Sequence, residues 1–250
     1  MKRLFSILIM FGLTVGLTAQ NTIIATADFN SVSVRDAFNV ILIPSDRNEV
    51  IVPKNLQLPQ GVEAKDVISV RRGTLTIALP ENRRRTNFRI NDRQPDIRVY
   101  FKSLNSLALA GSSSVTSAGT IRASTFQLSL AGSGRATLNI VAGTITSGLS
   151  GSGRLTLTGR ANEHNISVSG SGRIHAENVL ETKNSRVSVS GSGTANVSAE
   201  SVHVSLSGSG RITLQAKEVT GHASGSGRIV LNADAQRNIS TSGSARIQTL

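Results

Sequence analysis

Apolar and polar residues alternate along most of the chain beyond residue 100, with an aliphatic side chain at every second position. Before one Gly-Ser-Gly tripeptide the apolar positions are Leu128 and Leu130, and after it they are Ala136 and Leu138. A period of two is typical of a strand that buries one face and exposes the other. The pattern therefore predicts two short strands per repeat, one on each side of the tripeptide, with Ser, Thr, Asn and Gln outside.

The tripeptide returns at intervals of 17 to 21 residues, which is the period of one solenoid coil. Counting degenerate copies, its first glycines are Gly111, Gly132, Gly151, Gly170, Gly191, Gly208, Gly225 and Gly243. An isolated coil cannot bury its apolar face, whereas stacked coils pair each strand in parallel with its equivalents above and below. We therefore predict an all-β parallel solenoid, or β-helix, of about seven coils over residues 104–250. We expect it to be right-handed, as parallel crossovers usually are.

Glycine-rich turns also occur in phosphate-binding loops, so this alternative was weighed. A P-loop needs a following Lys-Ser/Thr and a helix, and a dinucleotide fingerprint needs a third Gly three residues on; neither follows these turns. Glycine is instead expected at the corner between strands, where it permits positive φ and close backbone stacking.

Residues 20–103 lack the repeat but contain strand-like segments, such as 39–43, 74–79 and 96–101. Most aromatic residues and prolines lie in this part of the chain. We expect an irregular β lobe that caps the N-terminal end of the solenoid. Residues 20–250 can equally form one continuous domain.

Residues 1–19 have the pattern of a secretory signal peptide. Lys2 and Arg3 precede an apolar run over residues 4–17, and small residues end at Ala19. A transmembrane anchor is the alternative, but the run is short and interrupted by glycines. The chain has no Cys, which excludes a lipid-modified cysteine and disulfides. We therefore expect an exported protein, periplasmic or at the cell surface, with no transmembrane segment after cleavage.

Three further segments resemble one known family. Residues 29–34, 73–77 and 104–107, followed by serial Gly-Ser-Gly turns, are similar to the auto-transporter adhesin family with the head GIN domain. The resemblance covers about residues 29–250. It implies a β-helical exported domain, common in Bacteroidetes, with adhesion proposed by analogy of shape. It implies no catalytic or ligand residues.

The chain carries a formal net charge of +12, or +10 once Lys2 and Arg3 leave with the signal peptide. A basic balance of this size favours polyanionic partners. For an exported protein these are lipopolysaccharide phosphates, acidic polysaccharide, host glycans or extracellular DNA. Export makes cytosolic nucleic acid an unsuitable partner.

One arginine follows most of the turns, immediately before an inward aliphatic residue. These candidate anion-binding residues are Arg135, Arg154, Arg173, Arg211, Arg228 and Arg246. By alternation they point outward, one per coil, and stacking would align them into a column interrupted at Thr194. Two interpretations stay open: a solvated edge that prevents aggregation of the coils, or a track for a linear polyanion.

A second basic cluster, Arg83, Arg84 and Arg85, followed by Arg89 and Arg93, lies between two expected strands, where we predict a hairpin tip. Its value as an anion contact is electrostatic and sensitive to salt. Since Phe88 is the one aromatic residue within it, lipid headgroups or acidic glycans fit better than stacked bases.

An enzyme is the rival interpretation, because many β-helix proteins cleave acidic polysaccharides. Such catalysis usually needs clustered carboxylates. Beyond residue 102 the acids are scattered: Glu163, Glu177, Glu181, Glu200, Glu218 and Asp234. The histidines lie at unrelated offsets from their turns: His164, His175, His203 and His222. We therefore expect no catalytic residues, no metal site and no cofactor.

The sequence thus predicts a non-enzymatic, adhesin-like binding protein outside the cytoplasm that engages a polyanionic glycan or lipopolysaccharide through its arginines. The alternative is a structural protein of the cell envelope that self-associates into homo-oligomers through its coil faces. A polysaccharide lyase is the less favoured third interpretation.

Overall fold

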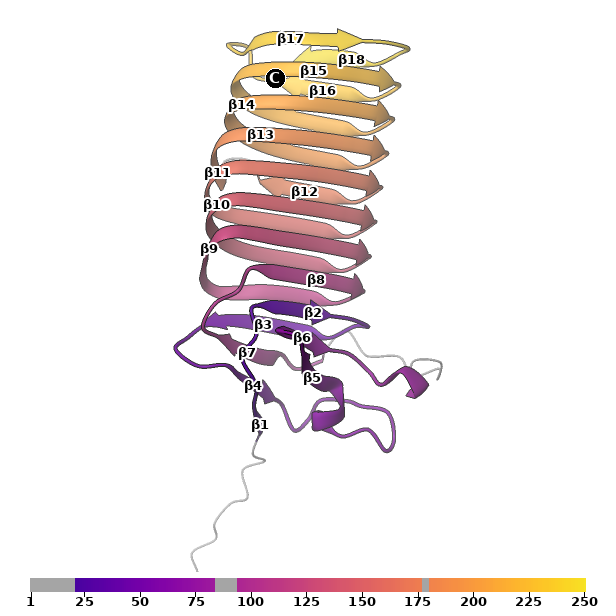
Figure 1. Ribbon diagram of the computed structural model, residues 1–250. Helices are drawn as coiled ribbons and strands as arrows, with labels where there is room; N and C mark the ends of the chain where they lie inside the picture. Colours follow the sequence, from indigo (N-terminus) through magenta and orange to yellow (C-terminus); the bar gives the residue numbers. More distant parts are fainter. Residues whose placement is uncertain (1–20, 84–93, 177–179) are drawn as a thin grey trace, which may run out of the picture.

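The computed structural model describes residues 21–83, 94–176 and 180–250 as a tall stack of coils on a less regular base (Figure 1). The 18 strands in these ranges belong to one hydrogen-bonded sheet. The same ranges contain two short 3₁₀ helices in the base, η1 (Ala64–Val67) and η2 (Glu81–Arg83). Within the described ranges no helix is long and apolar enough to cross a membrane. The predicted signal peptide lies outside the described residues.

The stack is a parallel β-solenoid, as predicted. Its strands are β8 (Ser106–Gly111), β9 (Ser114–Gly132), β10 (Arg135–Gly151), β11 (Arg154–Gly170), β12 (Arg173–Ala176), β13 (Leu180–Gly191), β14 (Thr194–Gly208), β15 (Arg211–Gly225), β16 (Arg228–Leu231), β17 (Gln236–Thr241) and β18 (Arg246–Thr249). Each pairs in parallel with its equivalents in the neighbouring coils. In Figure 1 the near half of each coil runs from left to right towards the turn, and the far half runs back from right to left. Because the chain rises from coil to coil, the solenoid is right-handed.

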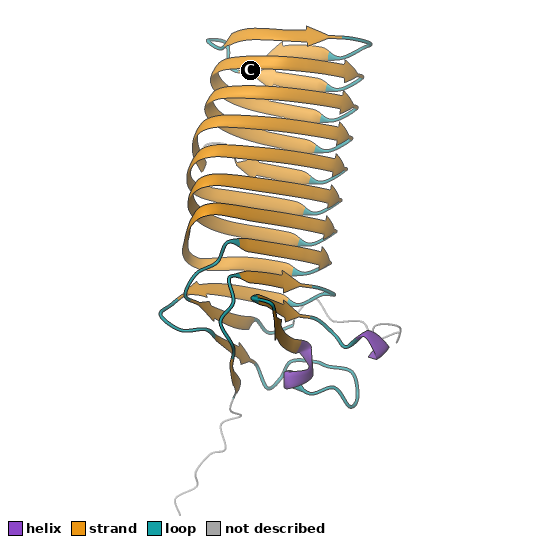
Figure 2. Ribbon diagram, in the orientation of Figure 1, coloured by secondary structure: helices purple, strands orange, loops and turns teal. Residues whose placement is uncertain are grey.

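The two short strands expected per coil are joined in β9, β10, β11, β14 and β15 into one strand of 15 to 19 residues. Each long strand curves on the side of the stack opposite the turns (Figure 2). Hydrogen bonding to neighbouring coils continues around this bend, because every coil bends at the same place.

Glycine forms the sharp corner because the stacked backbones leave no room for a side chain. Gly151 has φ +110°, and a Cβ there would lie 2.6 Å from the carbonyl oxygen of Gly132 in the coil below. The same oxygen accepts a hydrogen bond from the amide of Ser152 at 2.9 Å. The turns therefore stack into one continuous edge, which we call the turn column.

Aliphatic side chains fill the interior as ladders that run along the stack. One ladder contains Leu149, Val168, Val189 and Leu206, which pair in register and are at most 2% exposed. Burial of such side chains removes apolar area from water at about 25 cal/mol per Å². In a chain without disulfides, this layered packing and the backbone ladder hold the fold together.

The base consists of β1 (Thr22–Ala25), β2 (Ser31–Val34), β3 (Asn39–Pro44), β4 (Glu49–Val52), β5 (Ile68–Arg71), β6 (Thr74–Ile77) and β7 (Ile97–Phe101). Strands β2 and β3 pair in parallel with β8 and β9, so they form a further coil directly beneath the repeats. Strands β6 and β7 pair in parallel with β2 and β3 from the other side. The order along the stack is therefore β6/β7, β2/β3, β8/β9, which differs from the chain order.

The hairpin predicted around Arg83–Arg85 is wrong. Strands β6 and β7, which flank this segment, pair with β2 and β3 and not with each other in the described part of the chain. Strand β6 lies between β2 and β5, and β7 lies between β3 and β4, so neither has an edge left for pairing with the other. Arg83 ends η2, whereas Arg84, Arg85, Arg89 and Arg93 lie outside the described residues.

The last coil is polar at positions that are apolar in the coil beneath it. Arg237 pairs with Val219, and Thr249 pairs with Leu231. Val219 and Leu231 are buried, whereas Arg237 and Thr249 are exposed. Inward positions with polar side chains protect an open strand edge from pairing with another chain.

We expect the double change Arg237→Val with Thr249→Leu to make this end of the stack adhesive. Sedimentation velocity should then show concentration-dependent association that is weaker in the wild-type protein. The matched control, Asn238→Val with Gln248→Leu, adds the same apolar groups at outward positions of the same strands. Equal association of both double variants would show that the inward positions have no such role.

Candidate anion-binding site

The six arginines after the turns form an aligned column along the stack, as their spacing predicts. In the first group Arg135 pairs with Arg154 and Arg154 with Arg173. Thr194 follows next in the register. In the second group Arg211 pairs with Arg228 and Arg228 with Arg246. Neighbouring strands lie about 4.8 Å apart, so paired arginines are close neighbours along the stack. We call this row of six arginines the arginine column.

The arginine column carries charge that the described residues do not neutralise. Arg228 is half-buried and the other five members are exposed. Within the described ranges no member has an ion pair or a side-chain hydrogen bond. Arginines elsewhere do, since Arg160 lies 2.7 Å from Glu181 and Arg186 lies 3.8 Å from Glu163. The column is therefore a linear array of available guanidinium donors.

Local sequence fixes the outward direction of these side chains. Arg154 stands between Gly153 and Leu155, which are both buried, so its side chain points away from the interior. Two residues beyond the arginines, the next outward row contains Thr137, Thr156 and His175 in register, and its described members include no carboxylate. This row therefore does not oppose the positive potential of the column.

At the C-terminal end of the column the side chains enclose a small hollow of about 240 Å³. It is lined by Ser209, Gly210, Arg211, Ser226, Gly227, Arg228, Ser244 and Arg246. Nε of Arg228 is shielded from solvent and has no hydrogen-bond acceptor among the residues that the structure describes. Three guanidiniums and three turn serines thus surround a space without a carboxylate in its lining.

The outward row immediately before the turns is neutral, in contrast to the arginine column. Its members in these coils are Ser150, Ser169, Ser190, Ser207 and Ser224. Because these serines pair in register, the row is uniform along the stack. Immediately beside the turns, the exposed charge therefore lies on the side that follows them, whereas charged residues before the turns, such as Arg186, lie further along the strands.

The interior contains a buried polar pair that was not predicted from the sequence. His164 is fully buried, and its Nε2 lies 2.9 Å from Oγ of Ser147, whereas its Nδ1 has no partner among the described residues. Burial lowers the pKa of His164 to about 4, because the charged ring would lose its hydration. The signal was present: His164 shares the parity of Ile166, an inward position of the same strand.

The other histidines lie on the outer surface and do not gather. Nδ1 of His203 lies 3.1 Å from Oγ1 of Thr220, and Nε2 of His222 lies 3.1 Å from Oγ of Ser205. His175 is exposed on β12. In the described part of the chain no three His, Cys, Asp or Glu side chains are grouped to hold a metal ion.

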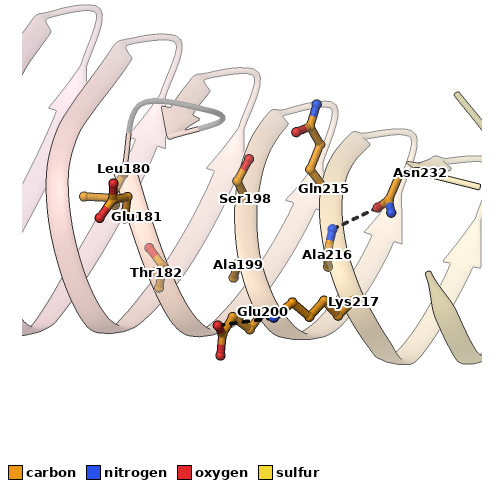
Figure 3. A pocket seen from close by; sticks show the side chains of 10 residues that line it. All are labelled: Leu180, Glu181, Thr182, Ser198, Ala199, Glu200, Gln215, Ala216, Lys217 and Asn232. Atoms are coloured by element: carbon orange, nitrogen blue, oxygen red, sulfur yellow. Dashed lines mark hydrogen bonds and ion pairs between the residues drawn. The ribbon is translucent and has the colours of Figure 1, made fainter. Parts of the chain in front are cut away.

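A wider groove of about 420 Å³ lies on the bend side of the upper coils, between β13 and β16. Figure 3 shows Thr182, Ala199 and Ala216 in successive coils, with Lys217 reaching across to Glu200. Nζ of Lys217 is 3.4 Å from Oε1 of Glu200, so these opposite charges are paired. The groove therefore has balanced charge, unlike the arginine column, and no pattern in the sequence pointed to it.

Comparisons with solved structures support the fold. A "putative adhesin" from Parabacteroides merdae matches with a TM-score of 0.76 at 15% identity, over 92% of this chain and 95% of that one. A "putative adhesin" from Bacteroides fragilis matches with a TM-score of 0.69 at 18% identity, over 92% and 96%. A "Putative lipid binding protein" from Parabacteroides distasonis matches with a TM-score of 0.64 at 18% identity, over 92% and 96%.

No curated protein matches the chain. A family model does match, over residues 28–215, and it spans the base and most of the coils described above. The resemblance seen in the sequence is thereby confirmed. The chain belongs to the family described as "Putative auto-transporter adhesin, head GIN domain".

Proposed function

We propose that this protein is a non-enzymatic binding protein, exported to the periplasm or the cell surface, that engages a polyanionic ligand along its arginine column. The observation that carries the proposal is the register of six guanidiniums without acidic partners in the described structure. A flexible anionic polymer can follow a straight row of such donors, because each bidentate contact repeats at the next coil.

The family and one structural neighbour define which ligands to test. Adhesins act outside the cytoplasm, where acidic glycans and lipopolysaccharide are the abundant polyanions. One similar structure is described as a lipid-binding protein, and anionic lipid headgroups present the same phosphate chemistry. Acidic polysaccharide, lipopolysaccharide and host glycans are therefore the proposed partners.

The test is a triple variant, Arg154→Gln with Arg173→Gln and Arg211→Gln, measured against immobilised heparin and lipopolysaccharide by surface plasmon resonance. We expect affinity to fall by about tenfold or more at about 50 mM NaCl, and the salt dependence to become shallower, because fewer counterions are released. Comparison with about 200 mM NaCl gives the slope.

The matched control removes three exposed cations that lie off the column and have no ion pair with described residues: Arg122→Gln, Lys183→Gln and Lys54→Gln. It changes the net charge equally. If the two triple variants lose affinity equally, the protein attracts polyanions by overall charge alone and the column has no special role. Unchanged affinity in both would exclude the proposed function.

A polysaccharide lyase is the enzymatic rival. Carboxylates near the bend are engaged in ion pairs, such as Glu181 with Arg160 and Glu200 with Lys217. Engaged and scattered carboxylates are poorly placed to share one substrate bond. Unsaturated, ultraviolet-absorbing products from any acidic polysaccharide would contradict the non-enzymatic proposal.

A further inference from the structure

We propose that the hollow formed by Arg211, Arg228 and Arg246 is a specific site for a tetrahedral oxyanion, the phosphate or sulfate group of a larger ligand. This inference rests on the proposed function, and it adds a position and a chemical class to it. The arginine column would then hold a polymer loosely along its length and one anionic group firmly at this end.

The three guanidiniums are arranged so that an anion can lie between them. Arg228 is centred between Arg211 and Arg246 in the register, so both neighbours lie one strand spacing away. Like charges at such a distance repel unless an anion lies between them. A dianion in contact with three arginines relieves this repulsion more fully than a single carboxylate can.

Arg228 itself differs from the other arginines of the column. It is the one half-buried member of the column, and its Nε has no acceptor among the described residues although it is shielded from water. A buried donor without a partner is unfavourable, so the Arg228 side chain gains when it turns this donor towards an anionic oxygen in the hollow. The exposed members of the column have no comparable deficit.

The lining and size of the hollow also suit one phosphate or sulfate group. Ser209, Ser226 and Ser244 are exposed hydroxyl groups at its rim, and hydroxyls add neutral donors for the remaining oxygens of a phosphate or sulfate. At about 240 Å³ the hollow is smaller than the pockets that enclose whole drug-sized ligands. It therefore suits one anionic group whose polymer or lipid continues outside.

The experiment compares Arg228→Gln with Arg154→Gln. Arg154 is the central member of the other arginine group and follows the same turn motif, so both variants lose the same charge. Inorganic phosphate binding is followed by ³¹P NMR. We expect Arg228→Gln to weaken binding by about tenfold and Arg154→Gln by less than about twofold, because only the former removes a donor from the hollow. Circular dichroism melting verifies that both variants fold, and Arg246→Gln provides a second variant in the same hollow.

Equal weakening by both single variants would overturn the specific site while leaving the proposed binding along the column intact. No phosphate binding by the wild-type protein would also overturn it, whereas the heparin and lipopolysaccharide measurements test the column independently. Heparin and phosphatidic acid vesicles then separate a sulfated glycan from a lipid phosphate as the source. Polygalacturonate carries only carboxylates. If its affinity for the protein fell more in Arg228→Gln than in Arg154→Gln, the site would not be specific for a tetrahedral oxyanion.

Discussion

Replacement of Gly151 by alanine is expected to lower the free energy of unfolding by about 3 kcal/mol. Two costs combine at this position. A residue with a Cβ is strained at φ +110°, and the Cβ would lie 2.6 Å from the carbonyl oxygen of Gly132. That oxygen belongs to the hydrogen-bonded turn beneath, so relief of the contact has to displace two coils together.

Urea unfolding followed by circular dichroism measures this change. The control is Ser152→Ala, because Ser152 is exposed in the same turn and its change should stay within about 0.5 kcal/mol of wild type. A Gly151→Ala variant as stable as the control would mean that the turns shift freely, and the stacked turn column would not be a rigid edge.

Acidification is expected to destabilise the protein through His164. The pKa of this ring is about 4 in the folded protein and near 6.5 in an unfolded chain, so the unfolded state binds more protons between these values. The contribution of neutral His164 to the free energy of unfolding is fully present above pH 6.5 and is lost as the pH falls towards 4. The loss amounts to about 3 kcal/mol.

The double variant His164→Ile with Ser147→Val isolates this effect. Both changes restore aliphatic residues to interior ladders, where Ile145 and Ile166 are the register neighbours of His164 and Ser147. Urea unfolding at several pH values between 4 and 7 gives the free energy of unfolding as a function of pH. This free energy should change less with pH in the variant than in the wild-type protein. Parallel curves would mean that His164 is not buried as a neutral group.

The sequence alone determined the repeating part of the molecule. Alternation set which face of each strand is buried, and the spacing of the Gly-Ser-Gly turns set the coil length. Once coils of nearly equal length stack, equivalent residues have to fall into register, so the arginine column followed from spacing alone. Its gap at Thr194 was equally visible.

The turn below the repeats was not visible in the sequence. Asp36 adopts φ +66°, and its carbonyl oxygen accepts a hydrogen bond from the amide of Ser112 at 2.7 Å. It thus continues the turn column without the Gly-Ser-Gly signature. Aspartate tolerates this conformation better than most residues, which allowed the motif to be absent.

Only the tertiary structure decided the order of the lowest coils, the pairing of His164 with Ser147 and the hollow around Arg228. Strands β6 and β7 come later in the chain than β2 and β3 yet lie beneath them. Periodicity encodes contacts between consecutive coils, because these follow from local spacing. Contacts that depend on where a non-repeating segment docks, or on how two side chains from different coils meet, are set by the complementary shapes of packed surfaces.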